Sequence, residues 1–128
     1  MMRRIFILAS CSTLVLVSAG LRSVGAGEKA LHALAPAKYA AIANPYAGDA
    51  SAREIGARIY AGNCAKCHEE DRQGRRIGPA LNGPEIRNAA PGTLFWVLEK
   101  GDQRRGMPSY ARFPEKYRWQ IVTYLQNR

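Results

Sequence analysis

The sequence is poor in side chains that bind metal ions. It holds two histidines, His32 and His68, and three cysteines, of which Cys11 lies far upstream of Cys64 and Cys67. A structural zinc site takes four cysteine or histidine ligands, and this chain supplies too few at useful spacing. Strand-like alternation of apolar and polar residues is also missing, which argues against the βαβ setting of a thioredoxin-type dithiol.

Acidic residues are scarce as well: 10 Asp and Glu stand against 19 Lys and Arg, a formal charge of +9. The basic residues are scattered along the chain and do not gather on one helix, a pattern that argues against a nucleic-acid partner. We expect such a basic protein to approach an acidic protein partner or a membrane surface through electrostatic steering.

Long apolar runs are limited to the N-terminus, where residues 5–21 carry no charge and follow Arg3 and Arg4. The small residues Val24-Gly25-Ala26 come next, so residues 1–26 are predicted to be a cleaved signal peptide. Two alternatives stay open. The run is just long enough for an uncleaved membrane anchor, and Leu8-Ala9-Ser10-Cys11 resembles a lipoprotein processing site. Membrane contact is expected only if this segment is retained.

Residues 27–50 are rich in alanine and interrupted by Pro36 and Pro45, and we interpret them as an extended tether. A short helix over residues 36–43 and a segment that wraps the domain are the alternatives. His32 falls in this tether and is expected to be a solvated side chain. The folded domain is predicted over residues 51–128.

The stretch Cys64-Ala65-Lys66-Cys67-His68 is the feature around which the domain is organised. Two thiols three positions apart, followed directly by a histidine, form the attachment motif for c-type haem. The motif predicts one haem c, bound covalently through Cys64 and Cys67, with the iron ligated by His68 from one side. Because such haem is attached outside the bacterial cytoplasm, the motif and the N-terminal signal support each other.

Helical patterns flank the motif. Ser51 and Glu54 have the spacing of a capping box, which predicts the start of a helix at this serine. Gly62 is predicted to end that helix. The apolar stripe of that helix is Ala52, Ile55, Gly56, Ile59 and Tyr60, and Gly56 on this stripe indicates a close backbone approach.

Two more helices are predicted downstream. The first begins at Pro91 and ends at Gly101. Its Trp96 is expected either to cover a haem edge or to pack within the protein. The other opens at Pro114. Their buried stripes are expected to be Leu94, Val97 and Leu98 in the first, and Tyr117, Ile121, Tyr124 and Leu125 in the second.

The polar, glycine-rich loop from Glu69 to Asn88 carries apolar residues able to line a haem, among them Ile77, Ala80 and Leu81. Pro79 has no N–H to satisfy, so its segment can lie against the ring edge. A backbone carbonyl there can accept the second ring N–H of His68. Pro79 and Leu81 are therefore predicted to contact the cofactor.

Met107 is the only methionine beyond the first two residues, and it lies in a loop before Pro108, outside any helical stripe. Its thioether is a soft ligand of the kind that completes haem iron coordination. Met107 is predicted to be the second axial ligand. The alternative is a partly exposed loop methionine.

Over residues 51–128 the chain resembles the small bacterial class I cytochromes c. The attachment motif, Gly78-Pro79-Ala80-Leu81 and Gly106-Met107-Pro108 carry this resemblance, in that order. The family implies an all-α fold in which the N- and C-terminal helices cross and loops wrap around one haem. The Asn44-Pro45 lead-in and the Met-Pro-Ser-Tyr loop are also similar to cytochromes that serve quinoprotein alcohol dehydrogenases.

These patterns predict a monomeric periplasmic electron carrier and no enzyme, because two axial ligands leave the iron no position for a substrate. It would pass single electrons from a redox protein donor, of the dehydrogenase type, to a downstream acceptor. One alternative is a fixed haem subunit of a dehydrogenase or oxidase complex. Another is a haem enzyme or gas sensor in which Met107 is labile.

Overall fold

The computed structural model describes residues 34–127, and within this range the chain forms helices and loops without a strand. The helices are the 3-10 helix η1 (Ala37–Ala41), α2 (Ala50–Asn63), α3 (Ala65–His68), α4 (Pro84–Arg87), α5 (Pro91–Lys100), the 3-10 helix η2 (Gln103–Arg105) and α6 (Glu115–Gln126). The predicted all-α class is confirmed. The predicted signal segment and His32 lie outside the described residues.

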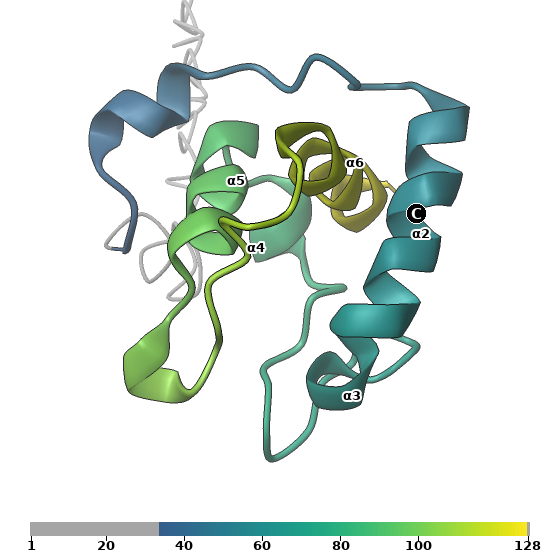
Figure 1. The fold of residues 1–128 in the computed structure, drawn as a ribbon, viewed down its shortest axis with the longest axis vertical. Helices are drawn as coiled ribbons and strands as arrows, with labels where there is room; N and C mark the ends of the chain where they lie inside the picture. Colours follow the sequence, from purple (N-terminus) through teal and green to yellow (C-terminus); the bar gives the residue numbers. More distant parts are fainter. Residues whose placement is uncertain (1–33, 128) are drawn as a thin grey trace, which may run out of the picture.

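The molecule is built on the crossing of α2 and α6, with α4 and α5 packed against α6 on its other side (Figure 1). The crossing is tight at Gly56. A Cβ at this position would fall 2.0 Å from the backbone oxygen of Gln120 and 3.0 Å from the Cβ of Tyr124. Only glycine allows the two backbones to approach this closely. The predicted crossing of the terminal helices, with a close approach at Gly56, is confirmed.

The hydrophobic core lies where these helices meet. Phe95 of α5 stacks on Trp119 of α6 with ring centroids 4.1 Å apart, and Tyr60 of α2 meets Tyr124 of α6 at 5.3 Å. Cys64 belongs to the same buried cluster. The core therefore reaches the end of α2, where the attachment motif begins.

The start of α2 differs from the prediction. Asp49, not Ser51, is the N-cap, and its Oδ1 accepts a hydrogen bond from the amide of Ala52 at 3.0 Å. The same bond holds the pKa of Asp49 below its usual value. A turn closed by a hydrogen bond from the Asp49 amide to the Tyr46 carbonyl places the Asp49 carboxylate at the helix start, two residues before Ser51. The helix also continues through Gly62 to Asn63.

The buried face of α6 is broader than predicted. Ile121 and Leu125 are buried as expected, but Tyr117 is 44% exposed, so its assignment to the inner face is wrong. Because α6 is sandwiched between α2 and the α4–α5 side, polar residues also face protein. The buried positions of α6 are Arg118, Trp119, Gln120, Ile121, Val122, Thr123 and Leu125.

The segment before α2 packs onto the helices. Its helix η1 lies against α5, where the rings of Tyr39 and Trp96 are 6.2 Å apart. Asn44 is buried, and its Nδ2 donates to Oγ1 of Thr123 at 2.9 Å. That hydroxyl in turn donates to the carbonyl of Tyr46. No helix within residues 34–127 is both long and apolar enough to cross a membrane.

Candidate functional site

Both cysteines and the histidine of the attachment motif lie on one helical turn. Cys64 is the C-cap of α2 and the N-cap of α3, and its carbonyl accepts the amides of Cys67 and His68 at 3.0 Å each. Neither thiol is in a disulfide. Burial, followed by the neighbouring Cys67, raises the pKa of the Cys64 thiol to about 11. Near neutral pH this site presents an uncharged, unpaired thiol beside an imidazole.

The His68 ring is held in one orientation. Its Nδ1 lies 2.8 Å from the carbonyl oxygen of Pro79. A carbonyl only accepts hydrogen bonds, so Nδ1 carries a proton and donates it, and the neutral ring with this proton has its lone pair on Nε2. A Cβ at Gly78 would fall 2.9 Å from Nδ1 and 2.8 Å from the carbonyl oxygen of Cys67. Glycine at this position lets the loop backbone reach the ring.

The loop that supplies the Pro79 carbonyl is tied to the helical frame at its start. The Tyr60 hydroxyl donates to the carbonyl of Glu69 at 2.8 Å. The Arg72 guanidinium donates to the carbonyls of Tyr124 and Asn127, at 3.3 Å each. The Arg72 carbonyl then accepts the amide of Leu81 at 2.7 Å. These contacts set the position of the loop against α3, and hence the orientation of the imidazole.

Met107 lies in the connection between α5 and α6. Its amide donates to the carbonyl of Asp102 at 3.0 Å, and its own carbonyl accepts the Asp102 amide at 3.1 Å. The side chain is half-buried and packs against the same core cluster that contains Cys64. Leu81 packs against that cluster as well. The structure thus brings the Cys64 thiol, Leu81 and Met107 to one hydrophobic cluster.

The chemistry of this donor set fits a covalently bound haem. Two free thiols can form thioethers, the oriented imidazole offers Nε2 to iron, and Met107 offers a soft sulfur. Several apolar side chains nearby in sequence are incompletely covered by protein. Ile77 is 70% exposed, and Pro79 and Ala80 are exposed beside it. A planar apolar cofactor would cover such side chains, because water contact is unfavourable for them.

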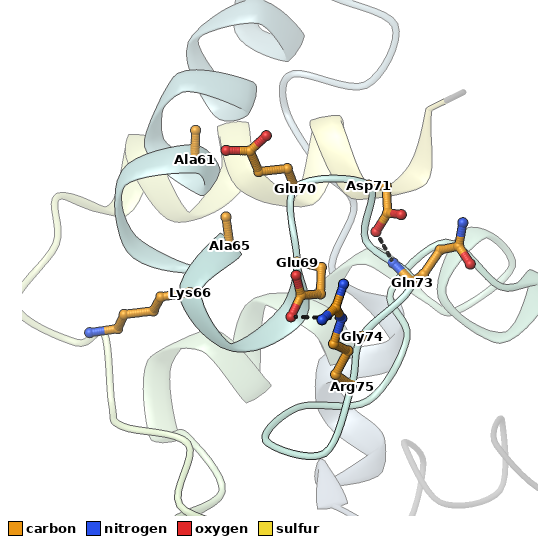
Figure 2. A pocket seen from close by; sticks show the side chains of 9 residues that line it. All are labelled: Ala61, Ala65, Lys66, Glu69, Glu70, Asp71, Gln73, Gly74 and Arg75. Carbon is orange, nitrogen blue, oxygen red and sulfur yellow. Dashed lines mark hydrogen bonds and ion pairs between the residues drawn. The ribbon is translucent and has the colours of Figure 1, made fainter.

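A separate surface hollow of about 680 Å³ lies between the end of α2, α3 and the following loop (Figure 2). Its lining is polar, and the Arg75–Glu69 ion pair of 3.4 Å runs along its wall. None of the six predicted site residues takes part in it. The lining residues are Ala61, Ala65, Lys66, Glu69, Glu70, Asp71, Gln73, Gly74 and Arg75. The hollow is therefore not the cofactor site.

The fold and the site define a c-type cytochrome domain. The family model for cytochrome c oxidase, cbb3-type, subunit III matches residues 51–125, and the chain belongs to this family. Haem c is the cofactor of such domains, which transfer single electrons. The predicted cytochrome c fold and class are confirmed.

Among solved structures, the chain is similar to cytochrome CL from the marine methylotrophic bacterium Methylophaga aminisulfidivorans. The two share 25% sequence identity, with a TM-score of 0.57 over 65% of this chain. The match spans 57% of the length of cytochrome CL. No curated protein matches the sequence.

Two contributors to the site escaped the sequence reasoning. The Gly78-Pro79 pair is part of a sequence motif, but the motif does not show that Gly78 lies against the His68 ring. This contact becomes visible only in the structure, where the loop backbone passes close to the imidazole. Arg118 was treated as one of many scattered basic residues, yet it is 8% exposed. Its position directly before Trp119, on a helix with an apolar stripe, was the available signal.

Proposed function

We propose that the protein is a periplasmic monohaem cytochrome that carries single electrons from a dehydrogenase-type donor to a downstream acceptor. In this proposal one haem is bound through Cys64 and Cys67, and the iron is ligated by His68 and Met107. The observation that carries it is the 2.8 Å contact between His68 Nδ1 and the Pro79 carbonyl. A histidine that binds a metal is typically fixed through its other ring nitrogen in this way.

Each residue has a distinct role in the proposal. The Pro79 carbonyl keeps the proton on Nδ1 and makes the imidazole more basic. Met107 favours the ferrous state, since a soft thioether raises the reduction potential. Leu81 and Pro79 shield the cofactor from water. The bound haem supplies a one-electron couple, and with both axial positions filled the chain presents no open site to a substrate.

The axial assignment is tested with Met107→Ala. Loss of the thioether is expected to remove the charge-transfer band of sulfur-ligated ferric haem, to lower the reduction potential and to let the ferrous protein bind carbon monoxide. Gln103→Ala, an exposed change in the same connection, serves as the control and should alter none of these. An unchanged spectrum and potential in Met107→Ala would show that another group, or none, ligates the iron.

For the donor, we propose a quinoprotein alcohol dehydrogenase. The proposal rests on the resemblance of Asn44-Pro45 and of residues 107–110 to cytochromes that serve such enzymes. The similarity to a cytochrome from a methylotrophic bacterium is in keeping with it. The second candidate is a fixed haem subunit of an oxidase complex, favoured by the name of the matched family. Co-purification with a large membrane partner that survives high salt would support the fixed subunit.

Export is the remaining part of the proposal. Residues 1–26 are proposed to be a signal peptide, and residues 27–50 to link it to the cytochrome domain of residues 51–128. Intact-mass analysis of the mature protein should give an N-terminus near Gly27 plus one haem, with both thiols consumed. A full-length chain recovered with membranes would establish the uncleaved anchor instead.

A further inference from the structure

A buried arginine holds the segment that precedes α6. Arg118 is 8% exposed, and its guanidinium lies over the ring of Phe95 at 4.8 Å. Three backbone carbonyls surround the Nη1 atom, those of Phe113 at 2.7 Å, Ala111 at 2.9 Å and Tyr110 at 3.4 Å, and its two hydrogens are shared among them. A buried charge costs desolvation free energy that an apolar side chain would not. The cost is offset here by charge-assisted hydrogen bonds to a single loop.

The same guanidinium also reaches α5. Its Nη2 lies 3.7 Å from the carboxylate of Glu99, and its Nε has no hydrogen-bond partner among the described residues. The end of α5 holds the segment independently, because the Leu98 carbonyl accepts the Tyr110 amide at 2.9 Å. Residues 110–113 are therefore fixed between α5 and α6, and within residues 34–127 Arg118 alone has a side chain that lies against three of their carbonyls.

Met107 lies directly upstream of this fixed point. The paired hydrogen bonds between Met107 and Asp102 close one side of the loop. On the other side only Pro108 and Ser109 separate Met107 from Tyr110, and the Ser109 hydroxyl donates to the Glu99 carbonyl. With so short a connection, the Met107 backbone can move away only as far as Pro108 and Ser109 allow while residues 110–113 stay on the Arg118 side chain.

We propose that Arg118 is the positioning residue for the distal ligand, and that it sets how firmly the Met107 thioether stays on the iron. The inference rests on the proposed axial role of Met107. The planar guanidinium is suited to this task, because its donors lie in a fixed fork that one compact ammonium group does not reproduce. Arg118 acts on iron coordination only through the loop.

The test uses the holoprotein with Arg118→Lys, which keeps the charge and loses the fork. In the ferric state imidazole competes with Met107 for the iron, so its affinity measures how easily the loop opens. Losing one hydrogen bond to a charged group should tighten imidazole binding about tenfold or more, since a tenfold change corresponds to about 1.4 kcal/mol and such bonds contribute at least that much. The reduction potential should fall as well.

Thr123→Val is the matched control, because Thr123 is also buried on α6 but its hydroxyl bonds only to Asn44, Tyr46 and Trp119. This variant should lower the unfolding midpoint without changing imidazole affinity. Equal imidazole affinity in Arg118→Lys and wild type, or an equal gain in both variants, overturns the inference. If Met107→Ala changes the spectrum while Arg118→Lys behaves as wild type, only this inference fails and the axial assignment stands.

A measurement on the wild-type protein applies even if Arg118 variants do not assemble. When imidazole displaces Met107, hydrogen exchange should accelerate at the Met107 amide, which bonds to Asp102. The Phe113 amide, which bonds to the Tyr110 carbonyl, should stay protected because Arg118 still holds that turn. Simultaneous acceleration at both amides would show that the loop opens as a whole, with no fixed point at Arg118.

Discussion

Gly78 and His68 show how little free space surrounds the imidazole. The loop backbone passes so close to the ring that a single added carbon would overlap both Nδ1 and the Cys67 carbonyl. The orientation of the imidazole therefore depends on the absence of a side chain as much as on the Pro79 carbonyl. A glycine required by close approach is easily mistaken for one required by a turn, since the sequence alone does not distinguish them.

Gly78→Ala should displace the Pro79 carbonyl from Nδ1 and make the imidazole a weaker electron donor to iron. We expect a changed reduction potential and a lower yield of holoprotein, measured by redox titration and by the haem-to-protein ratio. Gly62→Ala is the control, because a Cβ there meets nothing within 4 Å. That variant should gain about 0.5–1 kcal/mol of stability from its better helix propensity. Identical potentials in Gly78→Ala and wild type would show that the ring orientation does not depend on this contact.

At the scale of the helices, the α2–α6 crossing is the most tightly constrained contact. The crossing occurs at Gly56, where the backbone of α6 lies within reach of any larger side chain. Interiors are packed at crystal-like density, so neighbouring helices cannot absorb even one extra carbon without moving.

Gly56→Ala is therefore expected to destabilise the domain by about 1–3 kcal/mol, the usual cost of overpacking, despite the better helix propensity of alanine. Denaturant unfolding of the holoprotein measures this directly. The opposite result, a gain in stability, would mean that the two helices separate at low cost. In that case the haem, and not the helix crossing, would dominate the stability of the domain.

Sequence patterns predicted the helices well because apolar periodicity determines which segments can bury a stripe. The same patterns predicted the details less well. Ser51 and Asp49 are both good capping residues, and the choice between them depends on how the chain leaves the turn at Tyr46. Tyr117 was predicted to lie on the inner face of α6, and Arg118 was not. The reverse is found, because a helix packed on two sides buries positions outside its apolar stripe.

At the functional site, too, some features follow from the sequence and others do not. Spacing alone predicts haem attachment at Cys64, Cys67 and His68, since covalent attachment requires these residue types in this order. A hydrogen bond between His68 and a backbone carbonyl of the Pro79 segment was predicted, and in the structure this carbonyl is that of Pro79. The contacts that hold the Met107 loop were not predictable. They join backbone carbonyls to a side chain on another helix, and neither partner carries a sequence signature.

At the scale of the whole molecule, surface charge is the property that first acts on an approaching partner. Lys66 is exposed within the attachment motif, and Arg104 and Arg105 are exposed on η2, just before Met107. Arg105 pairs with Asp102 at 3.5 Å, which offsets part of its charge. Exposed pairs of this kind add little to stability, so their effect is expected on encounter rates.

Arg104→Glu should slow bimolecular reduction by the physiological donor at low ionic strength, if that donor is acidic near its docking site. The difference from wild type should shrink as salt shortens the Debye length to about 8 Å. Arg53→Glu is the control, with the same charge change in the first turn of α2, roughly 16 Å along the helix from Cys64. Equal rates for Arg104→Glu and Arg53→Glu would remove η2 from the docking surface.

The crossing of α2 and α6 also dictates an order of events during maturation. The contact at Gly56 joins the first long helix of the domain to the last, so the core cannot close until the end of the chain is available. Cys64 is 8% exposed once it has closed. If haem is attached to this thiol as proposed, the attaching enzyme would have to act on an open chain, before α6 docks. The cofactor would then be present when the helices assemble, and the domain would fold around it.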